Sequence, residues 1–367
     1  MRALLCIIII IFIGFFYPVS GQASIDVSGN NALLLEQKTG RVLFEKNAHE
    51  KASIASITKI MTAIIAIESG KMDEKATASR KAIYTEGSSI YLEQGEKMTI
   101  KDLVYGLMLR SGNDAAIAIS EHIGGSEEGF VHLMNEKAKW LGMTNTNFDN
   151  PHGLDSDNHY STAYDMAILM QYAMQNEEFA KISGTTDYLS ESRTYSWKNK
   201  NKLLTQFYEY CTGGKTGYTR KTGRTLVTSA EKEGMQLIAV TLNAPDDWQD
   251  HMRMFEWGFE EFDMHPLIEK GEFLYQFSGL EDISSGYLNR DVIYPLTNEE
   301  KDKIKNKNFI LKSSSLKEGE MIGKSVFYLD EQFIAEAPIL TPPSKSQNIV
   351  EEIYTMYKRL TGVYENG

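Results

Sequence analysis

The sequence predicts an α+β domain followed by a small all-β domain. Residues 56–176 contain several apolar segments of helical length, and strand-like segments lie on both sides of them in the chain. From residue 263 onward the pattern changes to short alternating strands. A chain of 367 residues is long enough to bury the cores of two such domains.

Residues 1–23 are predicted to be a signal peptide that is removed on export. Arg2 is followed by an uninterrupted apolar run over residues 4–16, and Gly21-Gln22-Ala23 is a small-x-Ala cleavage pattern. The alternative is an uncleaved membrane anchor. The run of about 13 apolar residues is, however, shorter than the roughly 20 that span a bilayer, so cleavage after Ala23 is favoured.

The composition excludes some classes of protein. The chain is acidic, with a formal net charge of −12 and no basic stripe, so nucleic-acid binding is not expected. Cys6 lies in the predicted signal peptide, which leaves Cys211 as the only cysteine of the exported chain. An internal disulfide is therefore not expected, and Cys211 is predicted to be a buried small hydrophobe rather than a reactive thiol.

The first domain is predicted to span residues 24–262 and to begin with a hairpin at residues 32–47. Lys38-Thr39-Gly40 forms its turn, where glycine suits the backbone geometry. The segment SITKIMTAIIAIESG, residues 56–70, is apolar on nearly every face and ends in glycine, as expected of a helix buried in the domain interior. The other predicted elements are helices at residues 100–109, 115–123, 127–141, 163–176 and 247–262, and strands at residues 224–230 and 235–244.

The second domain is predicted to span residues 263–345. The charged run KDKIKNKN, residues 301–308, is expected to be a solvated loop rather than a binding patch. In the tail, residues 346–367, positions 347–360 have the spacing of an amphipathic helix, which either packs onto the β domain or lies in a membrane interface. The expected strands cover residues 271–280, 291–296, 308–312, 321–330 and 331–339.

Ser56 and Lys59 are the first candidates for chemistry. They are three residues apart at the start of the predicted buried helix, so both side chains lie on one face. A serine hydroxyl is a good nucleophile when a neighbouring base takes its proton, and a lysine amine is such a base only when neutral. Apolar neighbours and a second lysine brought close by folding would favour that neutral form. Ser-x-x-Lys also occurs at residues 229–232, after a strand, and at 314–317, in a polar loop, where no buried helix begins.

The tripeptide Ser-Gly-Asn also occurs twice. The copy at residues 28–30 follows the predicted cleavage site, in a segment expected to be loose. The copy at residues 111–113 lies between two predicted helices. A short loop at that point can hold a hydroxyl and an amide toward a cleft, so Ser111 and Asn113 are the candidates.

Together, SITK at residues 56–59, SGN at 111–113 and KTG at 215–217 resemble the ordered motifs of the serine penicillin-binding proteins and β-lactamases. The segments ASITKIMTA, LMLRSGNDAA, NPHGLD, HYSTAYDM and GGKTGYT resemble the D-alanyl-D-alanine carboxypeptidases of low molecular mass, which are peptidase S11-like. IESGKM, GSSIYL and WKNKNKLL resemble the sporulation-associated carboxypeptidases of endospore-forming bacteria. The resemblance implies a penicillin-binding protein/β-lactamase-like transpeptidase domain, an antiparallel sheet with helices, before the small β domain.

Lys-Thr-Gly occurs three times, at residues 38–40, 215–217 and 221–223. In the family, this triplet lies on a strand at the edge of the active site and follows glycines that permit close backbone approach. Here only the copy at residues 215–217 follows such a pair, Gly213-Gly214. The copy at 221–223 is predicted to form a hairpin connection, and the copy at 38–40 precedes the nucleophile.

The resemblance implies a role for each matching residue. Ser56 would attack the carbonyl of a terminal D-Ala-D-Ala bond, Lys59 would take its proton, and Ser111 would relay a proton to the leaving amine. The backbone N–H groups of Ser56 and Tyr218 would hold the oxyanion. Lys215 and Thr216 would bind the free C-terminal carboxylate. The full set of substrate-binding residues would be Asn113, Lys215, Thr216, Gly217 and Tyr218.

His152 and His159 are weaker candidates. His152, in the segment NPHGLD, either approaches the cleft or is a loop histidine bonded to backbone. His159 with Asp155 and Asp157 resembles a metal cluster only superficially, and a structural loop is expected. The chain has neither an HExxH nor a Gly-x-Ser-x-Gly motif, so a zinc peptidase and an α/β-hydrolase are not supported. A metal site and a cofactor are not expected.

The expected function is that of a serine-type D-Ala-D-Ala carboxypeptidase. Such a hydrolase removes the C-terminal D-alanine from peptidoglycan stem pentapeptides through an acyl-enzyme, and β-lactams inhibit it covalently. It would act outside the cytoplasm, at the cell wall or the outer face of the membrane, and family likeness suggests spore cortex maturation at the forespore envelope. The alternatives are a β-lactamase, against which the lack of a Glu-x-x-Leu-Asn segment argues, and a non-catalytic penicillin-binding sensor.

Overall fold

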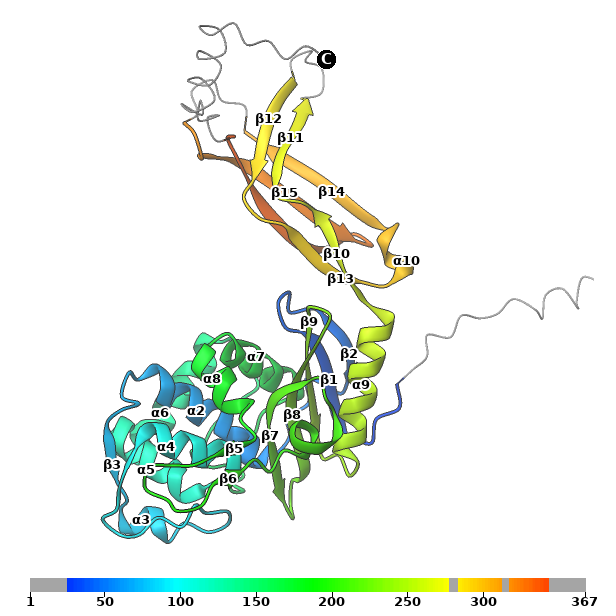
Figure 1. The fold of residues 1–367 in the computed structure, drawn as a ribbon. Coiled ribbons are helices and arrows are strands. Elements are labelled where there is room, and N and C mark those ends of the chain that lie inside the picture. The colour runs from blue at the N-terminus through cyan, green and yellow to red at the C-terminus, as the bar shows by residue number, and fades with distance from the viewer. Residues whose placement is uncertain (1–24, 277–282, 312–316, 343–367) are drawn as a thin grey trace, which may run out of the picture. The chain divides into compact units, whose positions relative to one another are not determined.

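The computed structural model describes residues 25–276, 283–311 and 317–342 (Figure 1). The predicted signal peptide, residues 1–23, and the predicted tail helix, residues 347–360, lie outside these ranges. The described residues form two compact units. Unit 1 takes them from Met1–Leu35, Val42–Ala230 and Ile238–Trp257, and unit 2 takes them from Glu36–Arg41, Glu231–Leu237 and Gly258–Gly367.

A five-stranded sheet with the strand order β2-β1-β9-β8-β7 forms the centre of the first part of the fold. Its strands are β1 Asn31–Glu36, β2 Val42–Lys46, β7 Cys211–Thr219, β8 Gly223–Lys232 and β9 Met235–Leu242. The pairs β1–β2 and β7–β8 are antiparallel, and Gly40 turns the first hairpin with a φ of 74°. The predicted hairpin and the two predicted strands that follow it in the sheet are confirmed. β7 lies at the edge of this sheet and has β8 as its neighbour.

Helices cover both faces of this sheet (Figure 1). α9, Asp247–Glu261, packs on one face, and the other helices of unit 1 lie beyond the opposite face. α2, Lys59–Glu68, contacts α4 to α8, and its residues 59–67 are all buried, so the predicted interior helix is confirmed. The remaining helices are α3 Arg80–Ile83, α4 Ile100–Tyr105, α5 Asn113–Gly124, α6 Glu127–Trp140, α7 Ala163–Met174 and α8 Glu177–Ser183.

Hydroxyl side chains determine where several of these helices begin. Thr99, Ser126 and Thr162 precede α4, α6 and α7, and each accepts a hydrogen bond from a backbone N–H in the first turn. The sequence therefore places a cap at the start of three helices of the layer that surrounds α2. Two short sheets also belong to unit 1, namely β3 Lys75–Thr77 with β4 Lys97–Thr99, and β5 Asp187–Tyr188 with β6 Trp197–Lys198.

Unit 2 contains a five-stranded sheet with the order β11-β12-β16-β15-β14 and a two-stranded sheet of β10 and β13 (Figure 1). The elements are β10 Asp263–Ile268, β11 Gly271–Gln276, β12 Ile283–Leu288, β13 Val292–Leu296, α10 Asn298–Lys301, β14 Ile304–Ile310, β15 Met321–Leu329 and β16 Gln332–Leu340. The core of unit 2 includes a cluster of buried side chains, namely Leu288, Val292, Ile322, Phe327, Ala337 and Ile339. The predicted β-rich domain is confirmed, and β10 and β12 are strands that the sequence pattern does not predict.

Residues 301–308 are solvated as predicted, but the prediction that they form a loop is wrong. β14 begins at Ile304 and pairs with β15 in antiparallel register from Ile304 opposite Leu329 to Ile310 opposite Gly323. β14 is an edge strand, and most of its side chains are exposed. An edge strand accommodates lysine and asparagine well, because such side chains also hinder pairing with other sheets. The polar composition of the segment therefore conceals a strand.

Candidate active site

Ser56 and Lys59 lie at the junction of a 3-10 turn, Ala55–Thr58, and helix α2. The Lys59 Nζ atom is 3.0 Å from Ser56 Oγ. Lys59 is completely buried, whereas Ser56 is partly exposed. The two side chains are therefore hydrogen-bonded, and the hydroxyl is the partner that a ligand can reach.

Three oxygen atoms surround the Lys59 amine. Nζ lies 3.0 Å from Ser56 Oγ and 2.7 Å from Asn113 Oδ1, and it also donates to the backbone carbonyl of His152. Burial is the main reason that the pKa of Lys59 lies well below its usual value, and the charges of two neighbouring lysines lower it further. A neutral amine has two N–H donors and one lone pair. Donation to Asn113 and His152 therefore leaves the lone pair for the Ser56 hydroxyl, as a general base requires.

Ser111 and Asn113 follow a π-helical segment, Gly106–Arg110, at the start of α5. Ser111 is buried and has a φ of 63°, in the left-handed region that residues with a side chain rarely adopt. Strained positions of this kind are concentrated at functional sites. The Asn113 amide has a fixed orientation, because Nδ2 donates to Glu86 O at 2.5 Å while Oδ1 accepts from Lys59.

Lys215 extends from the edge strand β7 to Ser111. Its Nζ atom is 3.1 Å from Ser111 Oγ and 2.7 Å from Thr216 O. Burial, with a smaller contribution from the charge of Lys200, lowers the pKa of Lys215 to about 7. The site therefore has a second buried amine, which changes its charge near neutral pH.

Gly217 allows β7 to approach the nucleophile. A Cβ atom at this position would lie 2.9 Å from Ser56 N and 2.4 Å from Thr225 Oγ1, distances that real side chains do not show. Earlier in the strand, Gly214 has a φ of 149°, and its N–H donates to a serine hydroxyl of α8 at 2.8 Å. The Tyr218 side chain is 65% exposed. The backbone of β7 thus passes Ser56 at contact distance.

The structure joins the predicted side chains in two hydrogen-bonded groups. One group consists of Ser56, Lys59 and Asn113. The other consists of Ser111 and Lys215. The groups are neighbours, because Ser111 and Asn113 are two residues apart and β7 contacts the 3-10 turn of Ser56.

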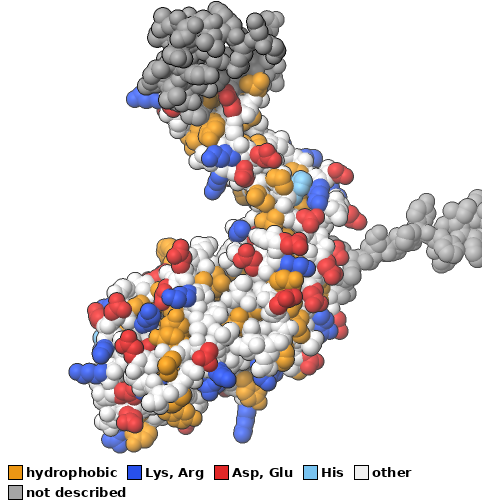
Figure 2. All heavy atoms as spheres, viewed as in Figure 1, with side chains coloured by type: hydrophobic (Ala, Val, Ile, Leu, Met, Phe, Trp, Pro, Cys, Tyr) orange, Lys and Arg blue, Asp and Glu red, His pale blue; other side chains and the backbone are white. Residues whose placement is uncertain are grey.

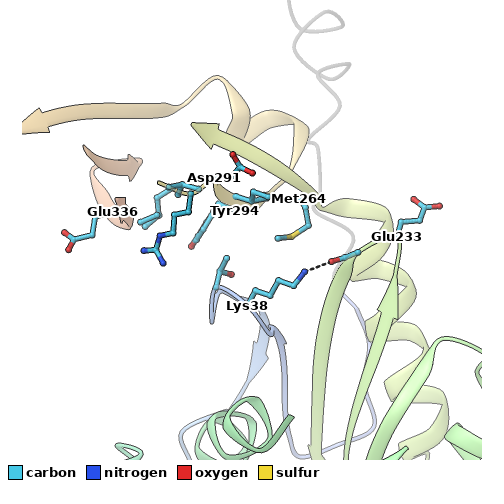
Figure 3. Close-up of a pocket in the computed structure, with 13 residues that line it drawn as sticks. Lys38, Glu233, Met264, Asp291, Tyr294 and Glu336 are labelled. Atoms are coloured by element: carbon cyan, nitrogen blue, oxygen red, sulfur yellow. Dashed lines mark hydrogen bonds between the residues drawn. The ribbon is translucent and has the colours of Figure 1, made fainter. Parts of the chain in front are cut away.

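The other copies of the short motifs have different partners. Lys221 is exposed and lies in the β7–β8 turn, with Nζ 2.9 Å from Asp157 Oδ1. The Ser-x-x-Lys copy at residues 229–232 lies in β8. Lys38 lines a pocket of unit 2, where Nζ donates to Gly234 O at 3.2 Å (Figure 3).

The expectation that residues 28–30 are loose is wrong. Ser28 Oγ is 2.7 Å from Asp250 Oδ2, and the Gly29 N–H donates to the same carboxylate at 3.1 Å. Asp250 lies in α9 and is completely buried, so it anchors this segment to the fold. The anchor is 222 residues away in the sequence, where local patterns give no sign of it. The Ser-x-x-Lys copy at residues 314–317 lies partly outside the described residues.

His152 contributes its backbone to the site and its ring to the loop. The carbonyl oxygen accepts from Lys59, while the buried ring accepts a hydrogen bond from Leu154 N–H at 3.2 Å. Both interpretations of this residue are therefore partly correct. Within residues 25–276, 283–311 and 317–342, His, Cys, Asp and Glu side chains do not form a group of three or more that could hold a metal ion.

His159 and Asp155 have structural partners, as expected for this loop. His159 Nε2 lies 2.7 Å from Thr58 Oγ1, and His159 Nδ1 accepts from Asp149 N–H at 3.0 Å. Asp155 Oδ1 accepts from two threonine hydroxyls at 3.0 Å. Cys211 is buried, as predicted, and burial raises the pKa of its thiol to about 12. A thiol with that pKa is a poor nucleophile.

Sequence reasoning missed Lys200. Its Nζ atom is 3.1 Å from Ser88 Oγ. Its charge lowers the pKa of both Lys59 and Lys215, although burial has the larger effect on each. Ser88 O in turn accepts from Asn113 N–H at 2.7 Å. Nothing in the polar run KNKNK distinguishes Lys200 from its neighbours, because its effect depends on segments far away in the sequence.

These groups suit acyl transfer. A serine hydroxyl beside a neutral buried amine can attack a carbonyl carbon, and backbone N–H groups at the close approach of β7 can stabilise an oxyanion. A second amine can bind a carboxylate when it is charged. On the face of unit 1 seen in Figure 2, acidic and basic side chains are interspersed, which is unlike the basic stripe of a nucleic-acid-binding surface.

Family models match both parts of the chain. Residues 19–246 match Peptidase_S11, D-alanyl-D-alanine carboxypeptidase, and residues 262–344 match the C-terminal domain of penicillin-binding protein 5. D-alanyl-D-alanine carboxypeptidase DacF of Bacillus subtilis (strain 168) is 36% identical over 329 residues, which cover 84% of each chain. D-alanyl-D-alanine carboxypeptidase DacC of Escherichia coli (strain K12) is 33% identical over 335 residues, 84% of this chain and 82% of that protein.

Solved structures support the same assignment. Penicillin-binding protein 5 from Haemophilus influenzae has a TM-score of 0.73 at 28% identity and covers 88% of this chain and 99% of its own. The predicted penicillin-binding-protein fold is thereby confirmed. Each helix in the described part of the chain is too short or too polar to cross a membrane. Because the family model matches more than half of its residues, this chain belongs to peptidase family S11, the D-alanyl-D-alanine carboxypeptidases.

Proposed function

We propose that Ser56 is the nucleophile with which this carboxypeptidase removes the terminal D-alanine of peptidoglycan stem pentapeptides. The observation that carries the proposal is the Lys59 amine, which is completely buried and lies 3.0 Å from Ser56 Oγ. A buried amine with a lowered pKa is neutral at a pH at which a solvated lysine is charged. It can therefore accept the hydroxyl proton as the bond to substrate forms.

In the first step, Ser56 Oγ attacks the carbonyl carbon of the penultimate D-alanine, and Lys59 takes the hydroxyl proton. A tetrahedral oxyanion forms and accepts hydrogen bonds from the N–H groups of Ser56 and Tyr218. The C–N bond then breaks, and D-alanine leaves with a proton relayed through Ser111. Water hydrolyses the remaining ester, which releases the shortened peptide and restores the hydroxyl.

Lys215 and Thr216 hold the free carboxylate of the substrate, and Asn113 binds its amide. A charge-assisted contact to the carboxylate selects chain ends over internal peptide bonds. The position of Lys215 supports this role, because the residue lies on the edge strand that passes the nucleophile. An extended peptide can add to such an edge through backbone hydrogen bonds.

Two parallel incubations separate this proposal from the two alternatives. The purified protein is mixed with a stem pentapeptide analogue and, separately, with a penicillin. Release of D-alanine together with a long-lived penicilloyl-enzyme supports the carboxypeptidase. Rapid hydrolysis of the drug without D-alanine release supports a β-lactamase, and permanent acylation without D-alanine release supports a penicillin-binding sensor.

The biological setting is part of the same proposal. We expect export after removal of residues 1–23, a catalytic domain over residues 24–262 and a β domain over residues 263–345. The amphipathic pattern at residues 347–360 supports peripheral membrane contact, which sedimentation of the full chain with anionic lipid vesicles would test. Likeness to sporulation-associated carboxypeptidases supports a role in spore cortex maturation.

A further inference from the structure

We propose that His159 is a positioning residue for the nucleophile, acting through Thr58 on the backbone of Ala55. The inference rests on the proposed role of Ser56, which follows Ala55 in the chain. His159 Nε2 lies 2.7 Å from Thr58 Oγ1, and Thr58 Oγ1 donates to Ala55 O at 2.7 Å. Ala55, Thr58 and His159 are all buried, so water does not compete for these hydrogen bonds.

The backbone fixes the direction of this chain of hydrogen bonds. Asp149 N–H donates to His159 Nδ1 at 3.0 Å, so Nδ1 is an acceptor and the ring proton lies on Nε2. Nε2–H therefore donates to Thr58 Oγ1, and the hydroxyl hydrogen of Thr58 goes to Ala55 O. Burial lowers the pKa of His159 to about 4, although the nearby carboxylates of Asp149 and Asp155 act in the opposite direction. The ring is therefore neutral at physiological pH.

Ala55 needs this support because its backbone is strained. Its φ is 49°, in the left-handed region, and such a conformation persists only when its surroundings hold it. Gly153 packs directly on the Ala55 carbonyl, since a Cβ atom at that position would lie 2.0 Å from Ala55 O. The preceding carbonyl is also held, because Thr225 Oγ1 donates to Ile54 O at 2.9 Å. The orientation of the Ser56 N–H and hydroxyl therefore depends on hydrogen bonds made by Ile54 and Ala55.

The test uses variants that remove or retain single hydrogen bonds. His159→Leu and Thr58→Val remove the donor at nearly constant volume, whereas His159→Gln and Thr58→Ser retain it. The acylation rate constant with a fluorescent penicillin, and kcat and KM for a stem pentapeptide analogue, are measured per titrated active site of the full chain. We expect the first two variants to lose about 10- to 100-fold in acylation rate and kcat, as a displacement of about 1 Å can cause, with KM nearly unchanged. The two conservative variants should recover most of the rate.

His251 offers a matched control, because its ring is also buried and hydrogen-bonded to a threonine, in this case to two threonine hydroxyls. It lies 2.6 Å from Thr228 Oγ1 and 3.1 Å from Thr241 Oγ1, and burial lowers its pKa to about 3. We expect His251→Leu to lower the thermal midpoint as His159→Leu does, but to leave the rate per active site unchanged.

Three results carry the decision. A wild-type rate per active site in both His159→Leu and Thr58→Val would overturn the inference. Equal losses of the rate per active site in His159→Leu and His251→Leu would overturn it as well. A wild-type protein that neither forms a penicilloyl-enzyme nor releases D-alanine would instead overturn the proposed function, because that result does not depend on His159.

Discussion

The Lys59 amine and the Ser56 hydroxyl are 3.0 Å apart, and the amine is completely buried. In water at neutral pH this amine would carry a proton and could not act as a base. Folding lowers its pKa by burial and by the charges of Lys215 and Lys200. The chemistry of the pair thus originates in the fold and not in the two residues alone.

Substitutions of Ser56 and Lys59 should reduce the rate of acylation by different amounts. Ser56→Ala should abolish covalent labelling by fluorescent penicillin, because the attacking oxygen is removed. Lys59→Met should slow labelling about 10²- to 10⁴-fold, the usual contribution of a positioned general base. Labelling is followed over time on a denaturing gel, with Ser229→Ala, from the rejected copy in β8, as the control. Persistent labelling of Ser56→Ala would place the nucleophile elsewhere.

Lys215→Gln should weaken the binding of substrates that have a free carboxylate. Loss of a hydrogen bond to a charged group costs about 1.5 to 3 kcal/mol, which should appear in kcat/KM for the stem pentapeptide. The loss should shrink for an analogue with an amidated C-terminus, because that analogue offers no carboxylate. Lys221→Ala is the control, since Lys221 is exposed and paired with Asp157. A collapse of activity in Lys221→Ala would contradict the choice between the two triplets.

Local signals were sufficient for much of the fold. The strand-turn-strand pattern around Gly40 predicts the hairpin, and the apolar character of nearly every face of residues 56–70 predicts the interior helix. Each of these features depends on a short stretch of chain, in which period and turn residues are visible. The order of the motifs at Ser56, Ser111 and Lys215 was visible in the same way, although their convergence depends on the sheet and helices between them.

The errors share a physical cause, which is interaction over long distances in the sequence. Ser28 is held by Asp250 in α9, and β14 is a strand because β15 pairs with it. Lys200 affects two lysines through space, so its charge matters only once the fold is known. Composition and hydrophobic period are properties of one segment. Burial and strand pairing also depend on the segments that pack against it, which a local pattern does not reveal.

Gly217→Ala should separate the strand from the nucleophile. The added Cβ atom would lie 2.4 Å from Thr225 Oγ1 and 2.9 Å from Ser56 N, so β7 or the turn must move. A shift of about 1 Å would cost on the order of 100-fold in acylation rate, measured with a fluorescent penicillin. Gly29→Ala is the matched control, because its closest neighbouring atom would be 3.2 Å away. Unchanged acylation in Gly217→Ala would show that this close approach is not required.

The two buried amines should give a bell-shaped dependence of kcat/KM on pH. Lys59 must be neutral to accept a proton, so the rate should rise as the pH passes its lowered pKa. Lys215 must be charged to bind the carboxylate, so the rate should fall as the pH rises through its pKa of about 7. A rate that does not fall as the pH rises through about 7 would contradict the assignment of Lys215, and a rate that does not fall toward lower pH would contradict that of Lys59.

Lys200→Gln should move this whole profile to higher pH. The positive charge of Lys200 disfavours protonation of both Lys59 and Lys215, so its removal makes both amines bind a proton more strongly and raises both pKa values. The ascending and descending limbs should therefore shift in the same direction, which a general loss of stability would not produce. Lys221→Gln removes an equal charge from an exposed position and should leave both limbs in place, because solvent and salt screen that charge. Profiles that coincide for Lys200→Gln and the wild type would show that Lys200 does not control the protonation of the site.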